Sequence, residues 1–254
     1  MRSPGTGMVT KAAVLCGGEG TRLRPLSNYF QKTMIPIGSK RRPLLEYIVR
    51  LIGYNGISEI TLLTGYRSED IEHYFGDGSG FGVNLSYSRD PEGRRGTALS
   101  LIGALDGGKL QGFDNLIVYY GDVLSAMNIM GLVSQHERRR SAMTLVLSRD
   151  YKVPVGVAQV VDEKVVSFAE KPTLPLNATV GALMFSKECV PVLRESASGK
   201  EAPDIMTHFV PRVIEKGMPV SPFYIDGFWY DVGTTESYEK LDSDLVEKNL
   251  KFLD

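Results

Sequence analysis

The chain has 254 residues, of which 43% are hydrophobic and 23% charged, and its formal net charge is -1. This composition is typical of a globular protein with a sizeable core, and the near-neutral charge argues against a dedicated binder of nucleic acid or of an anionic membrane. No apolar stretch reaches the length of a membrane span, and the start lacks the apolar core of a signal peptide. Cys16 and Cys189 lie far apart without metal-ligand spacing, so we expect reduced thiols and a cytoplasmic protein.

The first half of the chain alternates between predicted strands and predicted helices. Apolar or alternating runs predict strands at 11–16, 59–64, 83–88 and 115–120. Helical periodicity or start signals predict helices at 44–54, 68–75 and 96–105. This rhythm favours an α/β fold with a mainly parallel sheet flanked by helices, in which ligands bind at the carboxyl ends of the strands.

The second half of the chain is richer in predicted strands. These β-prone segments lie close together, at 141–148, 155–161, 165–170, 178–185 and 220–225. Helices are predicted at 186–194, 203–216 and 237–250. We therefore expect residues 11–254 to form one mixed α/β domain with a β-rich elaboration in its C-terminal half. Residues 1–10 are expected to be a short flexible leader.

A glycine-rich segment follows the first predicted strand. Gly17, Gly18 and Gly20 free the backbone from Cβ clashes, so that successive N–H groups can turn toward one anion. Arg22 and Lys32 follow within reach of the same anion. The combination predicts a cradle for a triphosphate, whereas the plainer alternative is a tight turn after an edge strand.

Two commoner glycine loops do not fit this segment. A Walker A loop requires Gly-Lys-Ser/Thr, but Gly20 is followed by Thr21 and Arg22. The dinucleotide-binding fingerprint requires a third glycine three residues after Gly20, and Leu23 stands at that position. The predicted cradle is therefore of another kind.

The segment resembles the signature of the sugar-1-phosphate nucleotidylyltransferases. Residues 17–26 match Gly-Gly-x-Gly-Thr-Arg-Leu-x-Pro-Leu in full. The signature continues with Pro-Lys-Pro-Met, of which this chain keeps Lys32 and Met34. Gln31 and Thr33 replace the two prolines, which can alter the stiffness of the loop but leaves its cation in place. The family includes glucose-1-phosphate thymidylyl-, uridylyl- and cytidylyltransferases and mannose-1-phosphate guanylyltransferases.

The resemblance extends from about Lys11 to about Leu241. It implies a Rossmann-like fold with a sugar-binding portion in the β-rich half. It also implies an enzyme that joins an NTP and a sugar 1-phosphate into an NDP-sugar, releases pyrophosphate and uses Mg²⁺. Arg22 and Lys32 would bind the triphosphate and the leaving pyrophosphate. The residues expected to contact the nucleotide through this loop are Cys16, Gly17, Gly18, Gly20, Thr21 and Arg22.

Two aspartates from remote segments are candidate metal ligands. Gly121 and Asp122 close an apolar strand, and Asp231 follows aromatic residues and precedes a glycine turn. Mg²⁺ in proteins usually takes one or two carboxylates together with phosphate oxygens and waters. The resemblance assigns Asp122 and Asp231 to the metal and places Gly121 beside the sugar phosphate. For Asp122 alone, the commoner explanation is a turn or helix-cap aspartate.

Glu170, Lys171 and Pro172 follow a predicted strand, and the proline is expected to hold the backbone of Lys171 extended. The resemblance implies that Lys171 holds the phosphate of the sugar phosphate and that Glu170 contacts sugar hydroxyls. The plainer reading is an exposed pair of charges at a strand end. Gly181 matches the family's glycine before a strand, where the backbone approaches the sugar, although the usual Asn-Ala-Gly is Thr-Val-Gly in this chain.

The nucleoside end of the site is predicted from Gly96, Thr97 and Asp90. Gly96-Thr97-Ala98 resembles the family's Gly-Thr-Ala, which packs against the nucleoside, although a plain helix start explains it nearly as well. Asp90 is the best match to the family's base-reading position. A carboxylate only accepts hydrogen bonds, so Asp90 suits a base edge that offers donors, such as guanine or the cytosine amino group.

Two other functions stay open at this point. One is a catalytically idle homologue that binds a nucleotide sugar and regulates a partner, supported by the altered segments at 31–33 and 179–181. The other is a cytidylyltransferase for a non-sugar phosphate such as phosphocholine. The chain is also a possible homo-oligomer. His73 and His136 are interpreted as surface residues of helices, because neither has a partner at metal-ligand spacing.

Overall fold

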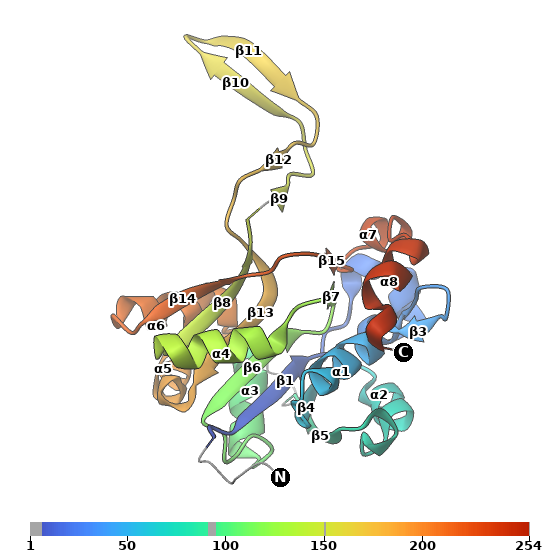
Figure 1. Cartoon of the computed structure of the whole chain (residues 1–254), viewed down its shortest axis with the longest axis vertical. Coiled ribbons are helices and arrows are strands. Elements are labelled where there is room, and N and C mark those ends of the chain that lie inside the picture. The colour runs from blue at the N-terminus through green and yellow to red at the C-terminus, as the bar shows by residue number, and fades with distance from the viewer. Residues whose placement is uncertain (1–6, 91–94, 150, 254) are drawn as a thin grey trace.

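A computed structural model describes residues 7–90, 95–149 and 151–253. Its centre is a seven-stranded sheet with the strand order β14-β8-β13-β6-β1-β4-β5 (Figure 1). The strands are β1 (Thr10–Leu15), β4 (Glu59–Thr64), β5 (Asn84–Arg89), β6 (Asn115–Tyr120), β8 (Met143–Ser148), β13 (Ala178–Ser186) and β14 (Val220–Tyr224). β13 runs antiparallel to β6 and β8, and the other neighbouring strands pair parallel. The predicted mixed, mainly parallel sheet is therefore confirmed.

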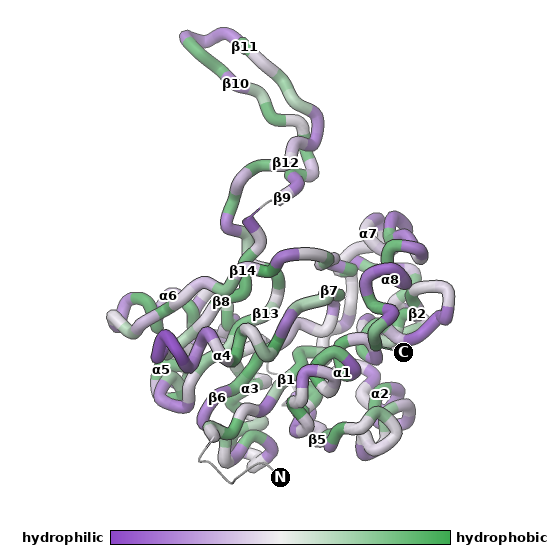
Figure 2. Tube along the Cα trace, in the orientation of Figure 1, coloured by the Kyte–Doolittle hydropathy of each residue, from purple (hydrophilic) through white to green (hydrophobic). Residues whose placement is uncertain are grey.

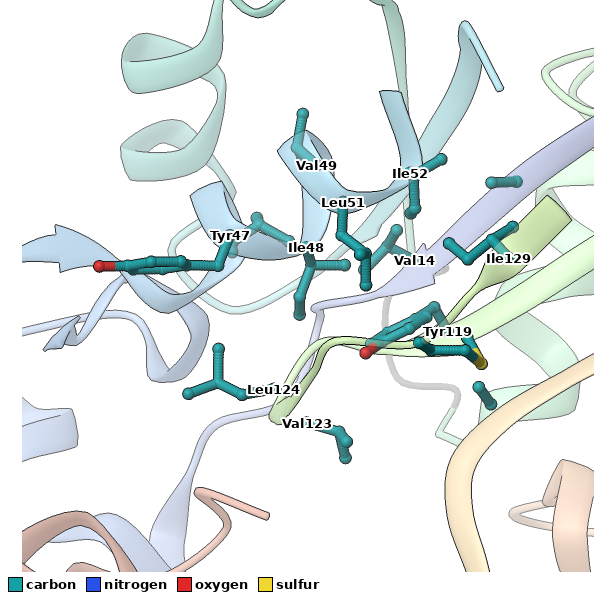
Figure 3. Close-up of a cluster of buried hydrophobic side chains, with 14 of the residues drawn as sticks. Val14, Tyr47, Ile48, Val49, Leu51, Ile52, Tyr119, Val123, Leu124 and Ile129 are labelled. Atoms are coloured by element: carbon teal, nitrogen blue, oxygen red, sulfur yellow. The ribbon is translucent and has the colours of Figure 1, made fainter. Parts of the chain in front are cut away.

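Helices cover both faces of this sheet. They are α1 (Leu44–Tyr54), α2 (Ser68–Phe75), α3 (Thr97–Asp106), α4 (Ile129–Arg139), α5 (Val190–Ala197), α6 (Val210–Glu215), α7 (Thr235–Glu239) and α8 (Ser243–Leu250). Successive residues of a strand point to opposite faces, so Val14 and Ala13 enter different cores. The core around Val14 contains Tyr119 and side chains of α1, as Figure 3 shows. The core around Ala13 is closed by α3, α5 and α6.

The observed helices differ from the predicted helices at two places. Helix α4 was not expected, because its sequence becomes strongly charged toward its C-terminal end, but Ile129, Leu132 and Val133 share one buried face. The single helix predicted at 237–250 is instead two helices. The break comes at Asp242, whose side chain accepts a hydrogen bond from the backbone N–H of Asp244 (2.8 Å) and caps α8.

His136 is a further correction, because it is buried rather than on the helix surface. It lies in the last turn of α4 and is 1% exposed. Its Nδ1 is 2.8 Å from the Thr144 hydroxyl and its Nε2 is 3.0 Å from the Ser186 hydroxyl. Burial lowers the pKa of His136 to about 4, so the imidazole is neutral near pH 7.

Four short two-stranded ribbons complete the fold. β2 (Pro36–Ile37) pairs with β3 (Arg42–Pro43), and β7 (Val123–Ser125) pairs with β15 (Trp229–Asp231). β9 (Tyr151–Lys152) pairs with β12 (Thr173–Leu174), and β10 (Val157–Val161) pairs with β11 (Lys164–Ala169). The predicted strands at 141–148, 178–185 and 220–225 join the central sheet as β8, β13 and β14, so only the last two ribbons form a separate β-rich elaboration. We call residues 151–174 the arm. The arm projects from the body of the molecule (Figure 1).

Apolar side chains of the arm lie in solvent. Phe168 is 66% exposed and Val160 is 60% exposed, and Figure 2 shows hydrophobic residues along both strands of the hairpin.

Residues 1–6 of the expected leader lie outside the described residues. Thr10 already belongs to β1, and the N–H of Val9 donates to Asp114 (2.9 Å).

Candidate active site

A cavity of about 560 Å³ opens where β1 and β6 end. This is the edge of the sheet at which the sequence predicts ligand binding. Many of the residues that line it are predicted site residues, namely Cys16, Gly17, Gly18, Gly20, Thr21, Lys32, Asp90, Gly96, Thr97 and Asp122. The structure thus brings the predicted nucleotide-binding segments together, although they are up to 106 positions apart in the sequence.

The glycines of the loop allow close backbone contacts. Gly20 has φ 66°, and a Cβ there would lie 2.9 Å from the Cβ of Lys32. A Cβ on Gly17 would lie 2.5 Å from an Asp90 carboxylate oxygen. Gly18 has open space around it, so the loop presents bare backbone at this point. The loop therefore links the predicted phosphate end at Lys32 to the predicted base end at Asp90.

Hydrogen bonds of the Gln31 side chain hold this loop in place. Its side chain is fully buried, and its Nε2 donates to the carbonyl of Cys16 (2.5 Å). Its Oε1 accepts from both the N–H (2.6 Å) and the hydroxyl (2.7 Å) of Thr33. Hydrogen bonds of Gln31 and Thr33 thus hold the segment around Lys32, where the family signature has prolines. Sequence reasoning missed this role because the side-chain partner is 15 positions away.

Cys16 contributes to the cavity wall as a buried thiol. Its Sγ donates to the carbonyl of Leu63 (3.3 Å). Burial, and to a lesser extent the neighbouring Asp90 carboxylate, raises the pKa of Cys16 above its ordinary value. Cys16 and Cys189 are both free and buried, as predicted. Cys16 therefore packs under the loop as a protonated thiol and is not an activated nucleophile.

The two predicted metal ligands are joined by the β7–β15 ribbon. Asp122 directly precedes β7, and Asp231 ends β15 opposite Val123. The N–H of Val232 donates to the carbonyl of Asp122 (2.8 Å), which fixes the two backbones beside each other. A backbone ladder thus holds two acids that lie 109 positions apart in the sequence.

Cations surround these acids. The Nζ of Lys32 donates to Oδ2 of Asp122, and both side chains are mostly buried. Burial and then the charge of Asp122 raise the pKa of Asp231, while the N–H of Gly233, Lys32 and Arg22 oppose this rise. Arg22 itself lies outside the cavity lining, but it reaches this cluster next to Gly233. Lys32, Arg22, Asp122 and Asp231 are therefore electrostatic neighbours.

The acid pair fits a magnesium ion of the type that binds with a nucleotide. Asp122 and Asp231 adjoin the β7–β15 ribbon beside Lys32 and Arg22, and Mg²⁺ readily combines carboxylates with phosphate oxygens. Within the described residues, no three His, Cys, Asp or Glu side chains gather into a ready-made metal cage. The donor set is thus too sparse for a closed structural site and leaves coordination positions for a ligand.

Asp90, the predicted base-reading residue, lines the cavity. This residue follows β5, and its N–H donates to the carbonyl of Thr64 (2.7 Å). Burial raises the pKa of the Asp90 carboxyl, an effect that the hydroxyl of Ser100 partly offsets. Its Oδ1 is buried and has no hydrogen-bond partner among the described residues. A buried acceptor of this kind is costly to leave unpaired, so it is suited to a donor from a ligand.

Gly96 and Thr97 are held by a segment that the sequence did not identify. Gly96 has φ 125°, and any Cβ there would overlap the backbone of Pro203. The Thr97 hydroxyl donates to Asp204 (2.7 Å) and accepts from the N–H of Ile205 (2.8 Å). Burial raises the pKa of Asp204, but the hydrogen bonds it accepts lower it overall. Asp204 lines the cavity opposite the glycine loop, and its remote position gave no motif.

The predicted sugar-phosphate residues lie outside the cavity lining. Glu170 and Lys171 are exposed on the arm, after the end of β11. Lys171 has φ 48°, so the expected extended backbone is wrong, because the chain turns sharply here to pair β12 with β9. Lys240 and, more weakly, Lys171 lower the pKa of Glu236 at the start of α7. The charge of Lys171 is therefore within electrostatic range of α7.

The two predicted glycines flanking the sugar side serve close packing. Gly121 donates its N–H to the carbonyl of Leu15 (2.9 Å), and a Cβ there would lie 2.6 Å from that oxygen. Gly181 lies within β13 rather than before a strand, with φ 68°, at a register shift against β8. A Cβ on Gly181 would lie 2.8 Å from Val123. Gly121 thus lets two backbones meet, and Gly181 leaves room for the side chain of Val123, the residue after Asp122.

Comparison with known proteins agrees with this arrangement. The family model described as nucleotidyl transferase matches residues 11–248. The chain belongs to the nucleotidyl transferase family. This confirms the resemblance inferred from the glycine loop and the two acid motifs.

Among its relatives, a mannose-1-phosphate guanylyltransferase of Mycobacterium tuberculosis is 32% identical over 92% of this chain and 64% of its own length. A glucose-1-phosphate thymidylyltransferase of Streptomyces griseus is 32% identical over 94% of this chain and 65% of its own. A UTP–glucose-1-phosphate uridylyltransferase of Synechocystis is 28% identical over 95% and 64%. This nucleotidyl transferase chain thus spans slightly less than two thirds of the length of each of these relatives.

A solved structure supports the fold. A crystal structure from Bacillus anthracis, assigned as a glucose-1-phosphate thymidylyltransferase and solved with sucrose, superposes with a TM-score of 0.71. It is 24% identical and covers 91% of this chain and 93% of its own. No helix in the described part of the chain combines the length and the apolar character needed to cross a membrane.

Proposed function

We propose that this chain joins an NTP and a sugar 1-phosphate into an NDP-sugar and pyrophosphate. The observation that carries the proposal is one cavity lined by the glycine loop, by the ion pair of Lys32 and Asp122, and by Asp90 with its unpaired acceptor. The relatives named above transfer nucleotidyl groups to glucose 1-phosphate or mannose 1-phosphate. Family membership and the cavity thus support the same reaction.

In this reaction, an oxygen of the sugar phosphate attacks the α-phosphorus in line, and pyrophosphate leaves. Such transfers need positioning and charge stabilisation more than covalent chemistry from the protein. The bare backbone around Gly18 and the side chains of Arg22 and Lys32 bind the triphosphate and stabilise the departing pyrophosphate. Asp122 and Asp231 hold Mg²⁺, which neutralises phosphate charge when it is bound.

We further propose that Asp90 selects the base. A carboxylate with a buried, unpaired oxygen accepts from guanine or from the cytosine amino group, whereas uracil and thymine offer a ring N–H flanked by carbonyls. The guanylyltransferase relative is consistent with this choice, and the uridylyl and thymidylyl relatives are the alternative. GTP and CTP are therefore the expected substrates.

Lys171 and Glu170 are proposed to bind the sugar phosphate and the sugar hydroxyls. Because both lie on the arm and outside the cavity lining, this contact requires the arm to approach the body when substrate binds. The free, buried thiols of Cys16 and Cys189 are consistent with a cytoplasmic enzyme, and a homo-oligomer remains part of the proposal.

The test is a substrate panel. The purified chain is incubated with Mg²⁺, glucose 1-phosphate or mannose 1-phosphate, and each of GTP, CTP, dTTP, UTP and ATP. Pyrophosphate release and the mass of the nucleotide sugar are measured. We expect turnover with GTP or CTP, and Asp90→Gln should shift the preference toward UTP or dTTP by roughly tenfold. Absence of turnover with every pair rejects the proposed activity, and a strong wild-type preference for dTTP rejects the role of Asp90.

A further inference from the structure

The acids and cations beside the cavity balance each other's charge before any substrate binds. Asp122 and Asp231 carry two negative charges, and Lys32 and Arg22 carry two positive charges. Lys32 is bonded directly to Asp122, with side-chain exposures of 14% and 19%. Asp231 accepts a hydrogen bond from the N–H of Gly233 (2.6 Å), and the guanidinium of Arg22 lies beside that same glycine. The site is thus neutral as a group and internally paired.

This pairing opposes a metal ion that arrives alone. A dication that approaches Asp122 meets the ammonium of Lys32 on Oδ2, and Coulomb repulsion at such contact distances is strong where water is partly excluded. The N–H of Val232 holds the backbone of Asp122, and the Asp122 carboxylate lies against Lys32 in the cavity wall. The lysine must therefore move before Asp122 can serve the metal fully.

The phosphate groups of a bound nucleotide would offer Lys32 an alternative ion-pair partner. Lys32 lines the same cavity as the glycine loop, and its Cβ packs close to Gly20. A lysine ammonium on a flexible stem can move between acceptors a few ångströms apart. Phosphate oxygens on the loop thus offer it a new anionic partner, and the departure of Lys32 exposes Asp122.

From this geometry we infer that Lys32 is a positioning residue that couples metal binding to nucleotide binding, by blocking Asp122 until phosphate draws it away. The inference rests on the proposed function for the identity of the ligands. It goes beyond a phosphate contact, because it requires Lys32 to weaken metal binding in the free protein. Phosphate that binds without metal must also break the ion pair between Lys32 and Asp122, so Asp122 weakens metal-free phosphate binding.

The first experiment measures Mn²⁺ binding to the nucleotide-free protein by electron paramagnetic resonance. Lys32→Met should tighten Mn²⁺ binding by about tenfold, within the usual range of coupling between sites. Lys32→Arg keeps the positive charge and should bind Mn²⁺ like the wild type. Lys187→Met is the matched control, because Lys187 forms a 2.7 Å ion pair with Asp114 away from the cavity. Adding Asp122→Asn to Lys32→Met should abolish the gain.

A second measurement does not depend on the folding of the Lys32 variants. In EDTA, calorimetry with inorganic pyrophosphate compares Asp122→Asn with Asp231→Asn, since each removes one negative charge from the same cluster. Asp122→Asn should tighten pyrophosphate binding several-fold more, because it alone releases Lys32 from its ion pair. Equal gains in the two variants would overturn the inference, as would unchanged Mn²⁺ affinity in a folded Lys32→Met protein. Neither readout needs turnover, so a failure here is distinguishable from a failure of the proposed reaction.

Discussion

The cavity lies at the ends of predicted strands and the arm contains two predicted strands, but the two regions are packed in opposite ways. Strands β1 and β6 are covered by helices on both faces, and the residues at their ends are placed by packing and hydrogen bonds. The β10–β11 hairpin has no covering layer among the described residues, and its apolar side chains stay in solvent. A hairpin of two strands alone is marginally stable in water. The comparison teaches that a well-packed cavity and an arm with uncovered apolar side chains coexist in this chain.

The sharpest test of this contrast compares two phenylalanines. Phe185 in β13 is fully buried between Phe113 and Phe209, whereas Phe168 in the arm is 66% exposed. Phe185→Ala should lower the free energy of unfolding by about 3–5 kcal/mol, because it leaves a cavity in the core. Phe168→Ala should change it by less than about 0.5 kcal/mol. Urea denaturation measures both, and a large loss for Phe168→Ala would show that the arm is packed in solution.

The second prediction concerns the two acids beside the cavity. Asp122→Asn and Asp231→Asn should each lower turnover by at least roughly a hundredfold, since each removes charge that positions Mg²⁺ at the transferring phosphate. The fold should persist, as circular dichroism can verify. Asp114→Asn is the control, because Asp114 pairs with Lys187 at the opposite end of β6. Near-normal turnover of both cavity variants at low Mg²⁺ would remove the two-acid assignment.

The third prediction concerns the arm. Lys171→Ala should raise the KM for sugar phosphate about tenfold and also reduce kcat, since a charged hydrogen bond is lost in both the ground state and the transition state. The KM for NTP should change little, because Lys32 and Arg22 bind that end. Lys164→Ala on the same arm is the control and should leave both constants unchanged. Initial rates with each substrate varied in turn decide the matter. If only the NTP constant moves, Lys171 does not serve the sugar phosphate.

The smallest expected effect lies in the body, where packing is tight enough to bury an imidazole. The pKa of His136 is about 4 when folded, below its unfolded value of about 6.5. Between these values only the unfolded chain takes up the proton, so stability falls as the pH drops through this window. The slope of the unfolding free energy is up to about 1.4 kcal/mol per pH unit. Chemical denaturation from pH 7 to pH 4 should therefore give a steeper loss for the wild type than for His136→Gln, and equal slopes would contradict the burial.

Much of the nucleotide end could be predicted from the sequence, because its signals are local. Gly17, Gly18 and Gly20 follow a strand directly, and Asp122 ends another strand, so the rule for parallel sheets placed them at one edge. The confirmed sheet and family follow from the same signals. Gln31 and Asp204 could not be found in this way, since their roles depend on partners 15 and 107 positions away.

The sequence by itself determined most of the strands of the central sheet, most of the helices and the residue types at the cavity, because periodicity and glycine chemistry act over a few neighbouring positions. Tertiary structure alone decided the charge pairing of Lys32 with Asp122, the burial of His136 and the projection of the arm. It also turned Lys171 into the left-handed region against the local preference before Pro172. These features arise from contacts between segments far apart in the chain, and such contacts leave no periodic trace in the sequence.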